Sequence, residues 1–191
     1  MVEIVEPKSS WAAEFRELAE RLESLLGRAA RRIDHIGSTS VPGLPAKDVI
    51  DVQIRIGDWD PEIGRRMEQG GFRRHRRIDR DHVPPGEPES LDEWRKELYV
   101  EREGDRRANL HVRREGAANA IYPLLFRDYL RARPQTAAAY AQLKRLLSTE
   151  LREGARYATV KDPAVDLIWF AAREWAERTG WVPDRESPPA V

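Results

Sequence analysis

The sequence predicts an α+β domain, in which a β-sheet is flanked by helices and followed by more helices at the C-terminal end. Residues 11–27 carry apolar side chains at helical spacing, and residues 49–56 alternate between apolar and polar side chains. From residue 120 to residue 179 nearly all of the chain has a helical pattern. This order of helix, strand, loop, strand, helix, hairpin and further helices is typical of an α+β fold.

Length and composition limit the kind of protein. The chain has 191 residues, which fits a single domain over residues 1–182, and the proline-rich residues 183–191 are expected to form a flexible tail. Lys and Arg total 33, as do Asp and Glu, so the net charge of zero argues against bulk binding of nucleic acid or an anionic membrane. The absence of cysteine excludes disulfides and thiolate metal sites. Because the sequence shows neither a signal peptide nor a long apolar segment, we expect a cytoplasmic protein.

The first half of the chain is expected to contain two helices and two strands around a loop. The first helix begins after Ser10 and ends near Gly27. A short strand at 32–36 leads into the loop 37–45, which holds two Gly, two Pro and three Ser or Thr. After the strand 49–56, Asp60 followed by proline predicts the start of a second, short helix.

The strand at 49–56 is the clearest single element. Its even-numbered residues Ile50, Val52 and Ile54 are apolar and are expected to be buried. Its odd-numbered residues Asp51, Gln53 and Arg55 are polar and are expected to line an open cleft.

The second half of the chain is expected to contain a hairpin and three helices. The candidate strand 72–78 is rich in arginine, and five arginines between residues 73 and 80 either bind a second anionic substrate or belong to a solvated edge strand. A long loop at 79–92 precedes strands at 96–102 and 109–113, which are joined around Gly104. The predicted helices span residues 120–132, 136–153 and 163–179.

A glycine-serine turn before the clear strand has the features of a phosphate site. Gly37 permits close approach of the backbone to a phosphate, and Ser38 adds a hydroxyl donor. Asp51 follows 14 positions later on a polar strand face. One design explains both features if the turn holds a triphosphate while the carboxylate holds Mg²⁺ against it. The alternative is an ordinary tight turn followed by a solvated aspartate.

Several segments of the chain resemble the GrpB family, whose members have the nucleotidyltransferase fold with a mixed β-sheet. The resemblance covers residues 11–175, and the GrpB domain fused to dephospho-CoA kinase in actinobacteria is especially similar. No kinase P-loop is present, so kinase activity is not implied. In chain order the matching segments are residues 35–52, Ala108-Asn109-Leu110-His111-Val112, Leu125-Phe126-Arg127-Asp128-Tyr129-Leu130-Arg131, Tyr140 with Leu143-Lys144, and Tyr157 with Lys161.

The resemblance also implies which residues form a site. Nucleotidyltransferases use a Gly-Ser turn, two carboxylates separated by one residue, and a third acid on a later strand. Asp51 matches the first acid, whereas Gln53 takes the place of the second, and His111, Glu97 and Glu101 are the candidates for the third. Asp51 and His111 are therefore the implied catalytic residues, and Asp51 and Gln53 the implied metal ligands. The implied phosphate-binding residues are Gly37, Ser38, Thr39, Ser40, Lys47 and Arg127.

The function implied is Mg²⁺-dependent transfer of a nucleotidyl group from an NTP, with ATP as the first choice, to an unidentified small molecule. Activation of an acid as its adenylate belongs to the same class. The alternative is a nucleotide-binding or accessory module without turnover, as in GrpB domains fused to dephospho-CoA kinase. The neutral Gln53 favours the module, whereas Ser38 and Asp51 favour the enzyme. Neither a nucleic acid nor a membrane is expected as a partner.

Overall fold

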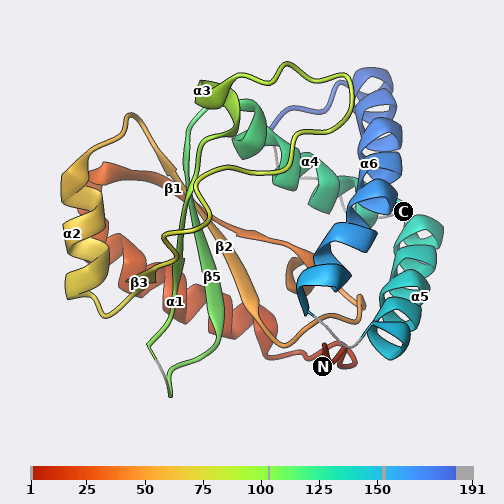
Figure 1. Cartoon of the computed structure of the whole chain (residues 1–191), viewed down its shortest axis with the longest axis horizontal. Coiled ribbons are helices and arrows are strands. Elements are labelled where there is room, and N and C mark those ends of the chain that lie inside the picture. Colours follow the sequence, from red (N-terminus) through yellow and green to blue (C-terminus); the bar gives the residue numbers. More distant parts are fainter. Residues whose placement is uncertain (1, 103, 152–153, 184–191) are drawn as a thin grey trace.

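The structure, a computed structural model, describes residues 2–102, 104–151 and 154–183. Figure 1 shows a central sheet with α1 and α2 on one side and α4, α5 and α6 on the other. The helices are α1 (Trp11–Leu26), α2 (Pro61–Gln69), α3 (Leu91–Trp94), α4 (Ala118–Ala132), α5 (Pro134–Glu150) and α6 (Gly154–Thr179), with short 3₁₀ turns η1 (Gly27–Ala29) and η2 (Ser38–Ser40). The strands are β1 (Ala30–Ile36), β2 (Ile50–Ile56), β3 (Arg73–Arg74), β4 (Glu97–Val100) and β5 (Ala108–Arg114). The predicted α+β class, with a mixed sheet, flanking helices and C-terminal helices, is confirmed.

The sheet has the order β1-β2-β5-β4-β3 and is mixed. Strands β2 and β5 are parallel, and the other neighbouring strands are antiparallel, including the predicted hairpin of β4 and β5. The parallel register pairs Asp51 with Asn109 and Gln53 with His111. Polar residues from two strands that are far apart in the sequence therefore lie side by side at the centre of the sheet.

The two faces of β2 meet different surroundings. Ile50, Val52 and Ile54 are fully buried in a core shared with α1 and α2, as predicted. The prediction that the opposite face lines an open cleft is wrong for Gln53 and Arg55, which are 0% and 4% exposed. Helix α4 covers this part of the sheet, and the backbone carbonyl of Ala120 accepts a hydrogen bond from Gln53.

A second hydrophobic core lies within the helical layer, between α4, α5 and α6. It includes Leu125, Tyr140 and Trp169 from the helices. Val41 and Leu44, from the loop that follows η2, are also buried in it. The loop between β1 and β2 is thus held by the sheet at its ends and by the helical layer in its middle.

Some boundaries differ from those predicted. Helix α6 begins at Gly154, so Pro163, which was expected at its start, lies inside it. Strand β3 is only two residues long, and the long loop contains the short helix α3. The predicted tail lies, apart from Pro183, outside the described residues, as does the predicted helix end at residue 153. In the ranges that the structure describes, no helix combines the length and apolar character needed to cross a bilayer.

Candidate functional site

The turn between β1 and β2 is shaped by a close approach to Asp51. Gly37 has φ +69°, a backbone conformation that side-chain-bearing residues rarely adopt. A Cβ atom at Gly37 would lie 2.3 Å from Oδ2 of Asp51. The amides of Ser40 and Val41 close the turn by donating to the carbonyls of Gly37 and Ser38. Glycine is therefore required here, and the turn and the strand aspartate are in direct contact as one unit.

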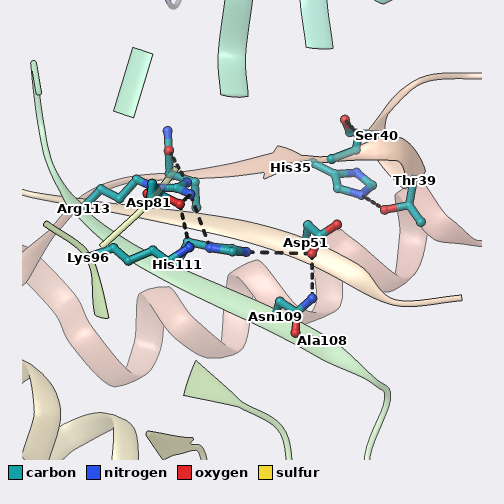
Figure 2. Close-up of polar contacts among 12 residues, drawn as sticks. His35, Thr39, Ser40, Asp51, Asp81, Lys96, Ala108, Asn109, His111 and Arg113 are labelled. Carbon is teal, nitrogen blue, oxygen red and sulfur yellow. Dashed lines mark hydrogen bonds and ion pairs between the residues drawn. The ribbon is translucent and has the colours of Figure 1, made fainter. Parts of the chain in front are cut away.

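Asp51 lies at the start of β2 and its side chain is 29% exposed. Its Oδ1 accepts a hydrogen bond of 2.9 Å from Nδ2 of Asn109 and lies 3.8 Å from Nε2 of His111, as Figure 2 shows. Burial alone would raise the pKa of this carboxyl. The contacts with His111 and Asn109 outweigh burial, with a further contribution from the charge of Lys161, so the pKa of Asp51 lies below its usual range.

His111 is held as a neutral imidazole with a defined tautomer. Burial, and then the neighbouring Arg113, lower the pKa of His111. Nη2 of Arg113 lies 3.3 Å from Nδ1 of His111. Because an arginine can only donate, Nδ1 must be the acceptor and the ring proton sits on Nε2, facing Asp51. The geometry therefore presents an N–H group, and not a lone pair, to the carboxylate.

Asp81 holds Arg113, the residue that contacts His111, although sequence reasoning assigned Asp81 no role. Its carboxylate accepts from Nε of Arg113 at 2.8 Å, from Nζ of Lys96 and from Nδ2 of Asn119 at 3.0 Å (Figure 2). Burial would raise the pKa of Asp81, but Arg113 and Lys96 hold it far below its usual range. A long loop is thereby anchored on the polar face of the sheet. In the sequence Asp81 is one of three aspartates in the predicted long loop, which carries no signal for such a role.

Gln53, implied as a metal ligand, uses its side-chain amide within the same network. Its Oε1 accepts from Arg113 at 2.9 Å, and its Nε2 donates to the carbonyl of Ala120 at 3.0 Å. Both ends of the amide are thus hydrogen-bonded beneath α4. Among the described residues, no group of three or more His, Cys, Asp or Glu side chains is arranged to hold a metal ion.

Lys144 of α5 reaches the turn from the helical layer. Its Nζ donates to Oγ of Ser38 at 2.9 Å and to the backbone carbonyl of Pro45, and the residue is only 3% exposed. Burial lowers the pKa of Lys144 to about 7, with the positive charge of Lys161 adding to the effect. In the sequence, its place in a GrpB-like segment was the one signal for this residue.

Two more lysines act electrostatically on this region, and Lys47, Lys144 and Lys161 are called the lysine cluster below. Nζ of Lys47 lies 4.4 Å from the ring centroid of Tyr157, and Nζ of Lys144 lies 4.7 Å from that of Tyr140. Burial lowers the pKa of Lys47, and the charge of Lys161 lowers it further. Tyr140 raises the pKa of Lys161, and the charge of Asp51 adds to this effect. The charge of Lys161 thus acts on both Lys47 and Lys144, and the charge of Asp51 acts on all three lysines.

The remaining predicted phosphate ligands hold the turn in place. Arg127 donates to the carbonyl of His35, and Arg131 of the same helix donates to the carbonyl of Ser40. Oγ1 of Thr39 lies 3.0 Å from Nε2 of His35, and Thr39 and Ser40 are 7% and 5% exposed. Burial lowers the pKa of His35 to about 4, so this ring is neutral near pH 7. These contacts give Thr39, Ser40 and Arg127 a structural role in shaping the turn.

The arginine-rich segment lies outside this site. Arg73 and Arg74 form β3, at the opposite edge of the sheet from β1, and both are exposed. Arg74 pairs with Glu97 at 2.8 Å. Of the two interpretations given above, the solvated edge strand agrees with this position.

Comparisons with known proteins agree with the segments singled out in the sequence. The model of a family described as GrpB protein matches residues 1–169. The dephospho-CoA kinase of Mycolicibacterium paratuberculosis is 32% identical over 199 residues, which are 95% of this chain and 48% of the kinase. The chain therefore spans about half the length of such relatives.

Solved structures show a related fold. The conserved protein GrpB from Enterococcus faecalis superimposes with a TM-score of 0.70 at 23% sequence identity, over 91% of this chain and 99% of that one. A structure of the Cid1 poly(U) polymerase is similar with a TM-score of 0.46 at 11% identity, over 74% of this chain and 43% of the polymerase. The superposition on the Enterococcus faecalis protein shows that this chain has the same fold as that GrpB protein.

Proposed function

This chain belongs to the GrpB family, and we propose that it binds a nucleotide through its phosphate groups at the turn that contains Gly37 and Ser38. The observation that carries the proposal is the contact of Lys144 with Ser38 in that turn, beside two further lysines that interact electrostatically with Lys144 or with Asp51. Burial of a lysine destabilises the fold unless its ammonium group interacts with an acceptor or an anion. Lys144 reaches the turn although it lies more than a hundred residues away in the sequence. Backbone amides, a hydroxyl and ammonium groups around one point are the donors that a phosphate requires.

A second candidate function is Mg²⁺-dependent nucleotidyl transfer from an NTP, with ATP as the first choice, to a small molecule. Asp51 favours it, because this carboxylate touches the turn that would hold the phosphates. Mg²⁺ commonly takes one or two carboxylates together with phosphate oxygens and water. Asp51 supplies one such ligand, with Oδ1 already hydrogen-bonded to Asn109, and Gln53 supplies none. These residues fit, at most, one Mg²⁺ ion shared with a nucleotide, and they do not fit a pair of metal ions.

Binding is tested by isothermal titration calorimetry with ATP, ADP, AMP and adenosine. We expect the phosphorylated compounds to bind and adenosine to bind much more weakly. Ser38→Ala should reduce affinity, because Ser38 accepts from Lys144 and lies at the start of η2. Ser24→Ala, which removes an exposed serine of α1, is the matched control. Absence of binding by all phosphorylated compounds, or equal binding of adenosine, would contradict the proposal.

Transfer is tested separately, by pyrophosphate release from each NTP with a panel of small-molecule acceptors. If the chain is a transferase, Asp51→Asn should lower turnover by about a hundredfold or more, the usual scale for losing one preorganised charged group. If wild-type protein binds nucleotide and releases no pyrophosphate with any acceptor, the chain is a binding module.

A further inference from the structure

Lysine is used very selectively in this chain. Five of the 33 Lys and Arg residues are lysines, and three of these five form the lysine cluster. Elsewhere arginine occupies every basic position except Lys8 and Lys96. Lysine differs from arginine in presenting a compact point charge with three donors, whereas the guanidinium group is planar and forked. Such a preference at one place indicates that the chemistry there needs compact cations.

The lysine cluster supplies positive charge near Asp51 and the turn, where a divalent cation would otherwise be expected. In a nucleotidyltransferase fold, paired carboxylates bind a metal ion that neutralises the phosphates. Here the second carboxylate position holds Gln53, which is fully buried and hydrogen-bonded to Arg113 and Ala120. The first carboxylate, Asp51, has cationic neighbours, since its charge acts on the pKa values of all three cluster lysines. Positive charge at this site thus comes from the protein itself.

Lys144 and Lys47 are held in place by contacts with uncharged groups. Lys144 hydrogen-bonds to two neutral oxygens, one of Ser38 and one of Pro45. Lys47 lies over the face of an aromatic ring. Among the described residues no carboxylate lies within ion-pair distance of Lys47, Lys144 or Lys161, whereas Lys8 and Lys96 each pair with an aspartate. The cluster lysines therefore form no direct ion pair among the described residues, although the charge of Asp51 acts on all three.

We propose that the lysine cluster takes the place of a divalent cation, so that the site binds the dianionic phosphate of a phosphomonoester directly through ammonium groups. This inference rests on the proposed function, because it concerns the same turn. A phosphomonoester carries a charge close to −2 at neutral pH. The contacts of Lys144 with uncharged oxygens, and of Lys47 with an aromatic ring, leave positive charge at the site that suits an anionic ligand. The expected ligand class is a nucleoside monophosphate or a similar phosphorylated metabolite, bound without metal.

The test uses AMP and inorganic phosphate as probes and compares titrations in excess EDTA with titrations in excess MgCl₂. We expect the same dissociation constant for AMP under both conditions. Lys144→Met and Lys161→Met should each weaken AMP binding about tenfold or more, because each removes a charge-assisted hydrogen bond. Lys8→Met is the matched control, since Lys8 is an exposed lysine paired with Asp48 outside the site. Circular dichroism and thermal unfolding of each variant separate loss of binding from loss of folding.

The outcomes distinguish this inference from the function on which it rests. Binding of AMP in EDTA that is lost in the folded cluster variants and kept in Lys8→Met supports the inference. Binding that appears only with Mg²⁺ overturns it while leaving nucleotide binding intact. Binding in EDTA that the folded cluster variants retain also overturns it, since the lysines would then not be the phosphate ligands. Absence of binding under both conditions overturns the proposed function and this inference together. Equal affinity for inorganic phosphate and AMP would assign the recognition to the phosphate group alone.

Discussion

Replacing Gly37 by alanine tests the contact between the turn and Asp51 most directly. The added Cβ has two separate costs in this structure. At φ +69° an alanine is strained, by about 1–2 kcal/mol for an L-residue in the left-handed region. The same Cβ would lie 2.3 Å from Oδ2 of Asp51 and 2.9 Å from its Cβ, so one segment must move. Forcing atoms into a packed site adds about 1–3 kcal/mol.

Gly43 provides the matched control for this change. It has φ +73°, nearly the same backbone strain, and a Cβ added there meets no atom within 4 Å. Gly43→Ala should therefore cost about 1–2 kcal/mol. Gly37→Ala should cost about 2–5 kcal/mol, the sum of the two terms. Both destabilisations are reduced slightly and by the same amount, because alanine has less conformational entropy than glycine in the unfolded chain.

The assay is urea unfolding of each variant, followed by the fluorescence of the six tryptophans. The excess cost of Gly37→Ala over Gly43→Ala measures the contact with Asp51. This excess should shrink in an Asp51→Ala background, where the carboxylate oxygen is gone. Equal destabilisation by the two alanines would show that Gly37 is not in close contact with Asp51, and the geometry of the site would have to be revised.

Three further predictions concern the buried charges. Asp81→Asn should destabilise the fold at pH 7, because Arg113 loses its ion-pair partner. Since the pKa of Asp81 is depressed, its contribution is present above about pH 4 and is lost as the pH falls, so the variant should show a smaller stability loss on acidification. Gln53→Asp should lower the free energy of unfolding, measured with urea, by about 2 kcal/mol or more, because the buried carbonyl of Ala120 loses its donor. Unchanged stability would refute the burial of Gln53. Lys144→Met should raise the free energy of unfolding near pH 6. The pKa of Lys144 is lowered to about 7, so its burial as an ammonium group destabilises the fold fully below that pH and progressively less above it. A stabilisation that does not become smaller towards pH 10 would refute the buried charge.

Local patterns predicted the parts of the fold that local forces determine. The alternation of strand β2 identified its buried apolar face, and the Gly-Ser pair identified a real turn. The polar face was predicted to be open because a local pattern cannot show that helix α4 lies over Gln53 and Arg55. Its burial depends on partners such as Arg113, sixty residues away from Gln53.

The candidate site was predictable to a similar degree. Asp51, Ser38 and Lys47 lie close together in the sequence, and their types suggested phosphate chemistry. Lys144 and Lys161 lie on helices, where isolated lysines are ordinary surface residues, so their composition and spacing carried no signal for the site. Tertiary packing brings Lys144 to the turn, and the resemblance of both segments to the family was the one indication that the sequence offered.

The loop between β1 and β2 belongs to two hydrophobic cores at once, and this has a consequence for local unfolding. Its ends continue into the sheet, whereas Val41 and Leu44 are buried among α4, α5 and α6. A phosphate bound both by the turn and by Lys144 would link the sheet to the helical layer. Local unfolding that separates α5 and α6 from the sheet would break the contacts of this phosphate. Bound ligand should therefore suppress that local unfolding. Amide hydrogen exchange in α5 and α6 should therefore slow on ligand binding, even at positions far from the phosphate, whereas exchange in α1 and α2 should change little.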